Sequence, residues 1–122
     1  MGLFGTLLAG NVSKRAVEAF RDEYKRQFGS NPPYEALDAI SAGATVIGAF
    51  AGTGREALGA ERLGGVVDSY VRAVGRNDNK IMLGIGLLAS MCMRPDGSTA
   101  RGYQWAINVL NNKSWEYLPH LG

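Results

Sequence analysis

The chain has 122 residues, of which 46% are hydrophobic and 20% are charged, and its formal net charge is +2. This balance excludes intrinsic disorder, and the length is typical of one helical domain that covers residues 1–122. A net charge this small does not indicate a nucleic-acid partner by itself, although residues 62–122 carry seven basic and only four acidic side chains.

Three stretches of the sequence contain no charged side chain, and charged segments separate them. They cover residues 1–13, 39–54 and 81–93. Each is shorter than the roughly 20 apolar residues that a helix needs to cross a bilayer. We therefore expect each stretch to be buried in the core, to contact another chain, or to lie on a membrane surface.

The first charge-free stretch has no basic residue before Lys14, which does not fit a secretory signal. Its opening residues, MGLFGT, fit the M-G-x-x-x-[ST] pattern for myristoylation. The apolar side chains of Leu3, Phe4 and Leu7 are candidate contacts with a partner. A membrane surface or the chain's own helices are the alternative contacts for residues 1–10.

The spacing of apolar residues predicts an all-α fold, a compact bundle of four to five helices joined by short turns. The first expected helix covers 12–28, the second begins after the N-cap Asn31, and the third covers about 55–75. The fourth covers about 80–93, with Asp78 or Asn79 as its cap. The fifth runs from a cap at Ser98 or Thr99 to about Leu110. The helix over 80–93 is apolar on all sides, so we expect it to be central.

The segment GTGREA at 52–57 fits the G-x-G-x-x-G/A fingerprint, in which amides at a helix N-terminus hold a dinucleotide pyrophosphate. That fingerprint needs a strand before the loop and a parallel sheet around it. Two helical patterns precede the segment, and the residues after it keep a helical period. We therefore favour a glycine-broken corner between two packed helices.

A tight turn and a helix are expected over 94–113, which is the general form of a helix-turn-helix element. The polar residues of this element are Arg94, Arg101, Gln104, Asn108 and Lys113. Arg, Gln and Asn are the side chains that recognise base edges in the major groove. These five residues are candidate nucleic-acid contacts, and they support an alternative function as a small regulator. A continuous basic stripe is missing, so this function ranks second.

Catalytic constellations are hard to assemble from this sequence. Its single cysteine, Cys92, lies in an apolar run where little thiolate forms, and its single histidine, His120, lies close to the C-terminus. A reduced, packed thiol favours a cytoplasmic location. No set of residues has the spacing of a zinc site or supplies a nucleophile with a base. We expect no enzyme activity, no cofactor and no metal.

The surplus of small and apolar residues leads to the main functional prediction. We expect a non-enzymatic helical interaction module that binds a protein partner or a second copy of itself through exposed helix faces. Tyr103, Trp105 and Trp115 are candidate anchors because aromatic residues are enriched at interface hot spots. Their alternative role is to fill one side of the core. A peripheral membrane protein is a lesser alternative function.

Overall fold

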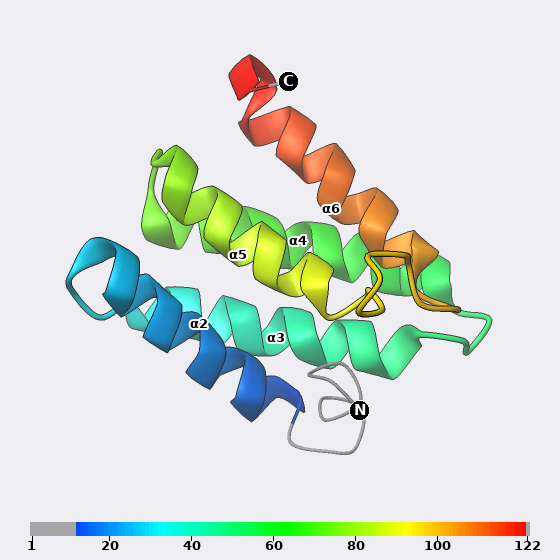
Figure 1. The fold of residues 1–122 in the computed structure, drawn as a ribbon. Helices are drawn as coiled ribbons and strands as arrows, with labels where there is room; N and C mark the ends of the chain where they lie inside the picture. Colours follow the sequence, from blue (N-terminus) through cyan, green and yellow to red (C-terminus); the bar gives the residue numbers. More distant parts are fainter. Residues whose placement is uncertain (1–11, 122) are drawn as a thin grey trace.

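The computed structural model describes residues 12–121 (Figure 1). Five α-helices follow one another in this range, and a short 3-10 turn closes it: α2 (Val12–Phe28), α3 (Tyr34–Phe50), α4 (Glu56–Val74), α5 (Asp78–Ser90), α6 (Gln104–Tyr117) and η1 (Pro119–Leu121). The only β-type pairing among the described residues is an isolated bridge between Met93 and Thr99. The predicted all-α fold is therefore confirmed.

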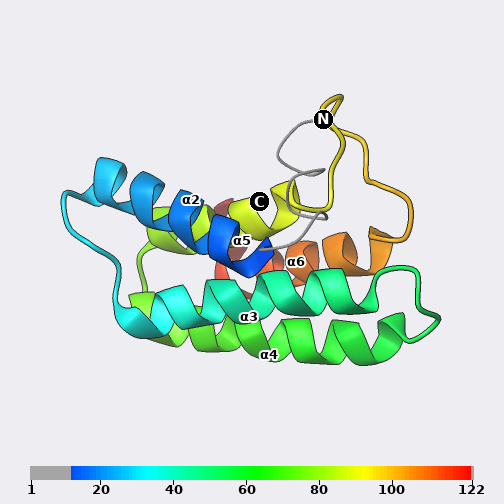
Figure 2. The ribbon, with the colours of Figure 1, turned by 90° about the horizontal axis from the view of Figure 1, so that it is seen from below.

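Helices α3 and α4 lie side by side and run antiparallel (Figure 2), and α2 packs against α3 while α6 packs against α4. Helix α5 contacts each of the other four helices, so the predicted central position of this apolar segment is confirmed. Its cover is incomplete, because Met82 and Gly86 are exposed on one side.

An aromatic cluster joins the first helix to the centre of the bundle. Phe20, Tyr24 and Phe28 follow one another at four-residue steps on α2, with ring centroids 5.6 and 4.8 Å apart. The ring of Phe20 meets the edge of Tyr70 from α4 at 5.6 Å. The ammonium group of Lys80 from α5 lies 5.5 Å from the Tyr24 ring centroid and 5.4 Å from that of Phe28. Three helices therefore share one set of aromatic contacts.

Tyr70 also sets how closely α4 and α5 approach each other. Its side chain is fully buried and lies against Gly84 of α5, and its hydroxyl donates a hydrogen bond to the Lys80 carbonyl. A Cβ at position 84 would lie 2.3 Å from the Tyr70 ring, so only glycine fits there. Burial raises the pKa of Tyr70, which keeps the hydroxyl protonated as a donor.

The boundaries of the last two helices differ from those expected. Asn77, rather than Asp78 or Asn79, caps α5 by accepting a hydrogen bond from the Lys80 N–H. Helix α5 ends at Ser90 instead of continuing to 93, and α6 covers Gln104–Tyr117 instead of running from Ser98 or Thr99 to Leu110. The expected tight turn at 94–97 is present, with the Gly97 N–H donating to the Arg94 carbonyl, but the helix after it begins six residues after Ser98 and extends beyond 113.

Residues 91–103 form a folded loop that accounts for this shift. The Arg94 N–H donates to the Ser98 carbonyl and the Ala100 N–H to the Cys92 carbonyl, each at 2.8 Å. The Ser98 hydroxyl donates to the Asp96 carboxylate at 2.6 Å. Ser98 is thus held in a local turn, and its side chain does not cap a helix.

We expect Gly84→Ala to lower the free energy of unfolding by about 2 kcal/mol, because the new methyl group forces Tyr70 out of place. The matched control is Gly86→Ala, two residues along the same helix, where a Cβ meets nothing within 4 Å. It should raise stability by up to about 1 kcal/mol through helix propensity alone. Urea denaturation followed by circular dichroism measures both changes. Equal effects of the two substitutions would contradict the proposed packing.

Candidate interaction site

An apolar groove lies between α5 and the C-terminal part of α6, and η1 borders it. Its volume is about 300 Å³, and it is lined by Met82, Asn111, Ser114, Trp115, Leu118 and Leu121. We call it the Trp115 groove. Its lining contains no charged side chain, and its polar side-chain groups are the Asn111 amide, the Ser114 hydroxyl and the Trp115 indole N–H. Such a lining suits apolar side chains and carries no charge that attracts an ion.

The Trp115 groove gathers most of the large apolar surface that the described chain leaves exposed. Trp115 is 63% exposed, Leu121 is 53% exposed and Met82 is 51% exposed, while Leu118 is buried beneath them. Tyr34 is the other large apolar side chain with comparable exposure in residues 12–121. Single exposed apolar residues are ordinary, but a contiguous group around a hollow is typical of an interaction site.

The helical period of α6 explains why these residues share one face. Asn111, Ser114, Trp115 and Leu118 are spaced at three- and four-residue steps, so their side chains lie along one stripe. The expected helix ends at Leu110, so this stripe lies beyond the part of α6 that the sequence predicts. The same periodicity would have found it if Asn111 and Asn112 had been kept within the helix.

A partly buried ion pair between Lys113 and Asp68 holds this end of α6 against α4. One carboxylate oxygen of Asp68, Oδ1, accepts hydrogen bonds from Lys113 Nζ at 2.7 Å and from the Tyr117 hydroxyl at 2.6 Å. Partial burial alone raises the pKa of Asp68, but the two hydrogen bonds and the charge of Lys113 outweigh it, and the pKa is lowered. These contacts point Lys113 and Tyr117 towards α4, which leaves Trp115 on the other side of α6.

The C-terminal turn is attached to the start of α5 by a second polar contact. His120 Nε2 lies 2.6 Å from Asp78 Oδ2, and the Leu121 N–H donates to the Leu118 carbonyl at 3.1 Å. His120 is therefore paired within the fold. This contact fixes Leu121 at the border of the Trp115 groove.

The structure does not bring the three candidate aromatic anchors together. Trp115 lines the groove, whereas Tyr103 is buried in the core. Trp105 is half-buried, and its Nε1–H donates to the Gly102 carbonyl at 2.9 Å. Tyr103 therefore takes the alternative role of filling the core, and Trp115 does not. The candidate contacts Leu3, Phe4 and Leu7 lie outside the described residues.

The five candidate nucleic-acid contacts do not form one stripe. Arg94 and Arg101 lie in the loop before α6, and Gln104 bonds Asn108 at 2.9 Å on the helix itself. The side chain of Lys113 is only 18% exposed because it pairs with Asp68. The residues of this set therefore do not lie on a single helix, and Gln104, Asn108 and Lys113 form contacts within the fold.

The remaining chemical motifs have a structural role or the wrong context. The glycines of the 52–57 segment follow helix α3 and not a strand, so the dinucleotide fingerprint lacks its sheet. Burial raises the pKa of Cys92 to about 12, and its thiol donates to the Leu88 carbonyl. Cys92 and His120 also lie at opposite ends of α5. They cannot act as a nucleophile and base pair.

Residues 12–121 contain neither a cluster of metal-binding side chains nor a helix that could span a membrane. In this part of the chain, no three His, Cys, Asp or Glu side chains come close enough to hold a metal ion. None of the helices described for it combines the length and hydropathy needed to cross a membrane. Comparisons with models of protein families, with curated proteins and with solved structures find no match to this chain.

We expect Asp68→Asn to lower the free energy of unfolding by about 1 kcal/mol at pH 7, because it weakens the bonds to Lys113 and Tyr117 at a partly exposed site. The folded-state pKa of Asp68 is depressed, so the carboxylate stabilises the fold above its unfolded pKa of about 3.9. This stabilisation is lost as the pH falls through the folded pKa.

The difference in the free energy of unfolding between Asp68→Asn and the unsubstituted chain should thus be largest at neutral pH. It should shrink as the pH falls below about 4. Urea denaturation at a series of pH values measures it. Asp22→Asn, an exposed change on α2, is the control and should show no comparable loss. A difference that stays constant from pH 7 to pH 3 contradicts the role given to the Asp68 charge.

Proposed function

We propose that this chain is a non-enzymatic protein-interaction module, and that the Trp115 groove binds apolar side chains on a helix of a partner protein. The observation that carries the proposal is the grouping of Trp115, Met82 and Leu121, each more than half exposed, above the buried Leu118. Tryptophan is enriched at interface hot spots, and hot spots lie in hollows from which water is excluded on binding.

The shape and lining of the groove support a helical ligand. Two helices, α5 and α6, form its walls, and helix-in-groove recognition places side chains at three- and four-residue spacing into such a site. A volume of about 300 Å³ is at the lower limit of small-molecule sites, which favours one or two large side chains over a bulky cofactor. The uncharged lining also favours a protein over a nucleic acid.

The expected strength of binding follows from the exposed area. Complete burial of a large apolar side chain contributes about 1.5–3 kcal/mol, so these three partly exposed residues supply on the order of 4 kcal/mol. Association itself costs at least about 4 kcal/mol in lost freedom of motion. The groove is therefore the hot spot of a wider contact and does not supply the whole interface. The packed, reduced thiol of Cys92 supports a cytoplasmic setting for this contact.

The proposal is tested by placing the photo-crosslinking residue p-benzoylphenylalanine at Asn111, on the border of the groove, in cells of the native host. Illumination should yield one discrete crosslinked protein. Adding Trp115→Ala should reduce that product at least tenfold, as loss of a hot-spot side chain typically does. The same substitution should change the free energy of unfolding by no more than about 1 kcal/mol, because most of the side chain is exposed.

Two controls distinguish binding at the Trp115 groove from nonspecific binding to the protein surface. The crosslinker at Gln27, an exposed position on α2, should not yield the same product. Tyr34→Ala removes the other strongly exposed aromatic side chain and should leave the Asn111 product unchanged. Product that persists in the Trp115→Ala chain, or that forms equally from Gln27, overturns the proposed function.

A further inference from the structure

A methionine forms part of the wall of the Trp115 groove. Met82 of α5 lines the groove and is 51% exposed. Met91 is only 3% exposed and Met93 is partly buried, while Met1 lies outside the described residues. In the described part of the chain, Met82 is therefore the methionine that a dissolved reagent reaches most readily.

A thioether sulfur reacts with a hydroperoxide by transfer of one oxygen atom. The sulfur lone pair attacks one oxygen of hydrogen peroxide, an S–O bond forms and the O–O bond breaks. The proton of the transferred oxygen passes to the departing hydroxide, which leaves as water. The sulfur is thus oxidised by two electrons and the peroxide is reduced. The product is methionine sulfoxide, which reductases convert back to methionine while a dithiol is oxidised to a disulfide and the oxygen leaves as water.

The added oxygen changes the polarity of the side chain. A thioether is flexible and apolar, whereas a sulfoxide is polar. The sulfoxide oxygen accepts hydrogen bonds from water in the open groove. An apolar side chain that enters the groove removes this water and offers no donor in its place, which costs free energy. The two forms of Met82 therefore differ in how well they accommodate an apolar ligand.

The cysteine of this chain is protected from the same oxidant. Cys92 is fully buried, and burial raises the pKa of its thiol to about 12. The thiolate is the form of cysteine that attacks a peroxide, and very little of it is present at neutral pH. Reaction with a peroxide is thus directed to the exposed thioether of Met82 rather than to the core.

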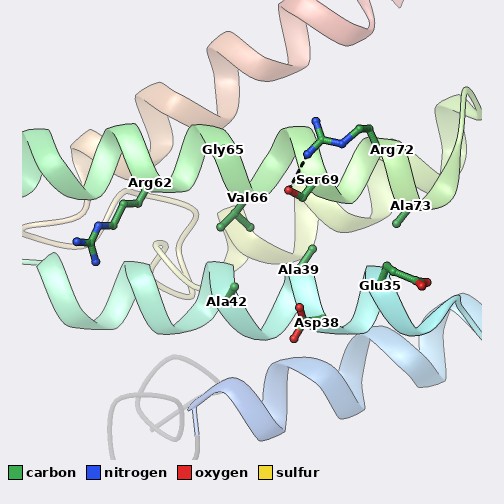
Figure 3. Close-up of a pocket in the computed structure, with 10 residues that line it drawn as sticks. All are labelled: Glu35, Asp38, Ala39, Ala42, Arg62, Gly65, Val66, Ser69, Arg72 and Ala73. Carbon is green, nitrogen blue, oxygen red and sulfur yellow. Dashed lines mark hydrogen bonds between the residues drawn. The ribbon is translucent and has the colours of Figure 1, made fainter.

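A second hollow of the described surface contains no oxidisable sulfur. It lies between α3 and α4, has a volume of about 760 Å³ and shares no lining residue with the Trp115 groove (Figure 3). Its lining consists of small residues and charged residues of both signs, among them Glu35 of α3 and Arg72 of α4 (Figure 3). Oxidation at Met82 therefore alters the Trp115 groove and leaves this hollow unchanged.

The position of Met82 on α5 allows the modification without unfolding. Gly84, which packs against Tyr70, lies two residues further along the helix. Two residues correspond to a rotation of about 200°, so the two positions lie on opposite sides of α5. An oxygen atom added to Met82 does not enter the contact between Tyr70 and Gly84.

We propose that Met82 is an oxidation site that controls the Trp115 groove. In its thioether form the groove binds the apolar side chains of the partner, and in its sulfoxide form the groove releases them. Reduction of the sulfoxide restores binding. This regulation rests on the proposed function, because it acts on the same groove.

The selectivity of the modification is measured on the purified full chain without a partner. The chain is treated with hydrogen peroxide, and tandem mass spectrometry locates the added oxygen. Met82 should be oxidised at least ten times faster than Met91, and circular dichroism should show unchanged helix content. Equal rates at Met82 and Met91, or loss of helix content when Met82 is oxidised, overturn the proposal.

The effect on binding is measured with the crosslinker at Asn111. The purified chain, with and without peroxide treatment, is added to an extract of the native host and illuminated. Oxidation should lower the yield of the crosslinked product at least tenfold, and the two methionine sulfoxide reductases, one for each sulfoxide epimer, should restore it.

Two substitutions assign the effect to one sulfur atom. Met82→Leu removes the thioether at nearly constant volume, so the yield after peroxide treatment should equal the yield of the same variant before treatment. Met93→Leu is the matched control and should remain as sensitive to peroxide as the original chain. A yield that falls equally in the Met82→Leu chain assigns the effect to another residue and overturns the proposal.

The regulation and the proposed function fail in different ways. A crosslinked product that is unchanged when Met82 is fully oxidised overturns the regulation and leaves the proposed function in place. Absence of any Asn111 product from the untreated chain overturns the proposed function and, with it, the regulation.

Discussion

The contact between Tyr70 and Gly84 is the constraint on which the arrangement of this bundle depends. The buried tyrosine ring of α4 lies against the bare backbone of α5, and the same ring meets Phe20 of α2. One side chain therefore fixes the separation of three helices. Helix α5 then lies at the centre with one uncovered side, on which Met82 is exposed next to α6.

The position of α6 follows from this central contact together with one polar network. Asp68 of α4 receives both Lys113 and Tyr117 and so determines which face of α6 is turned inward. Ser114 and Trp115 lie on other sides of the helix, and they are turned towards the open side of α5. The exposure of Trp115 is thus a consequence of polar contacts on the opposite face. The chain leaves a large aromatic ring in solvent because the inward positions are already filled.

Much of the architecture could be predicted from the sequence, because local signals and packing agree there. The apolar spacing on α2 and the glycine corner before α4 lie where the periodicity placed them, whereas α3 begins at Tyr34 after Pro33 and not directly after Asn31. The prediction failed over 91–103, where Ser98 has the form of a helix cap. Its hydroxyl bonds Asp96 and its carbonyl accepts from Arg94, so the local turn prevails over helix initiation. Because the last helix was expected to end at Leu110, its residues in the Trp115 groove were not predicted. The groove also takes residues from α5 and η1, which no local pattern connects to α6.

The attachment of η1 has a consequence for the Trp115 groove. The groove takes its lining from α5, α6 and η1, and η1 is held to the start of α5 through the contact between His120 and Asp78. Because α5 and η1 are far apart in the sequence, the groove is a property of the assembled bundle, and a peptide of α6 alone does not reproduce it.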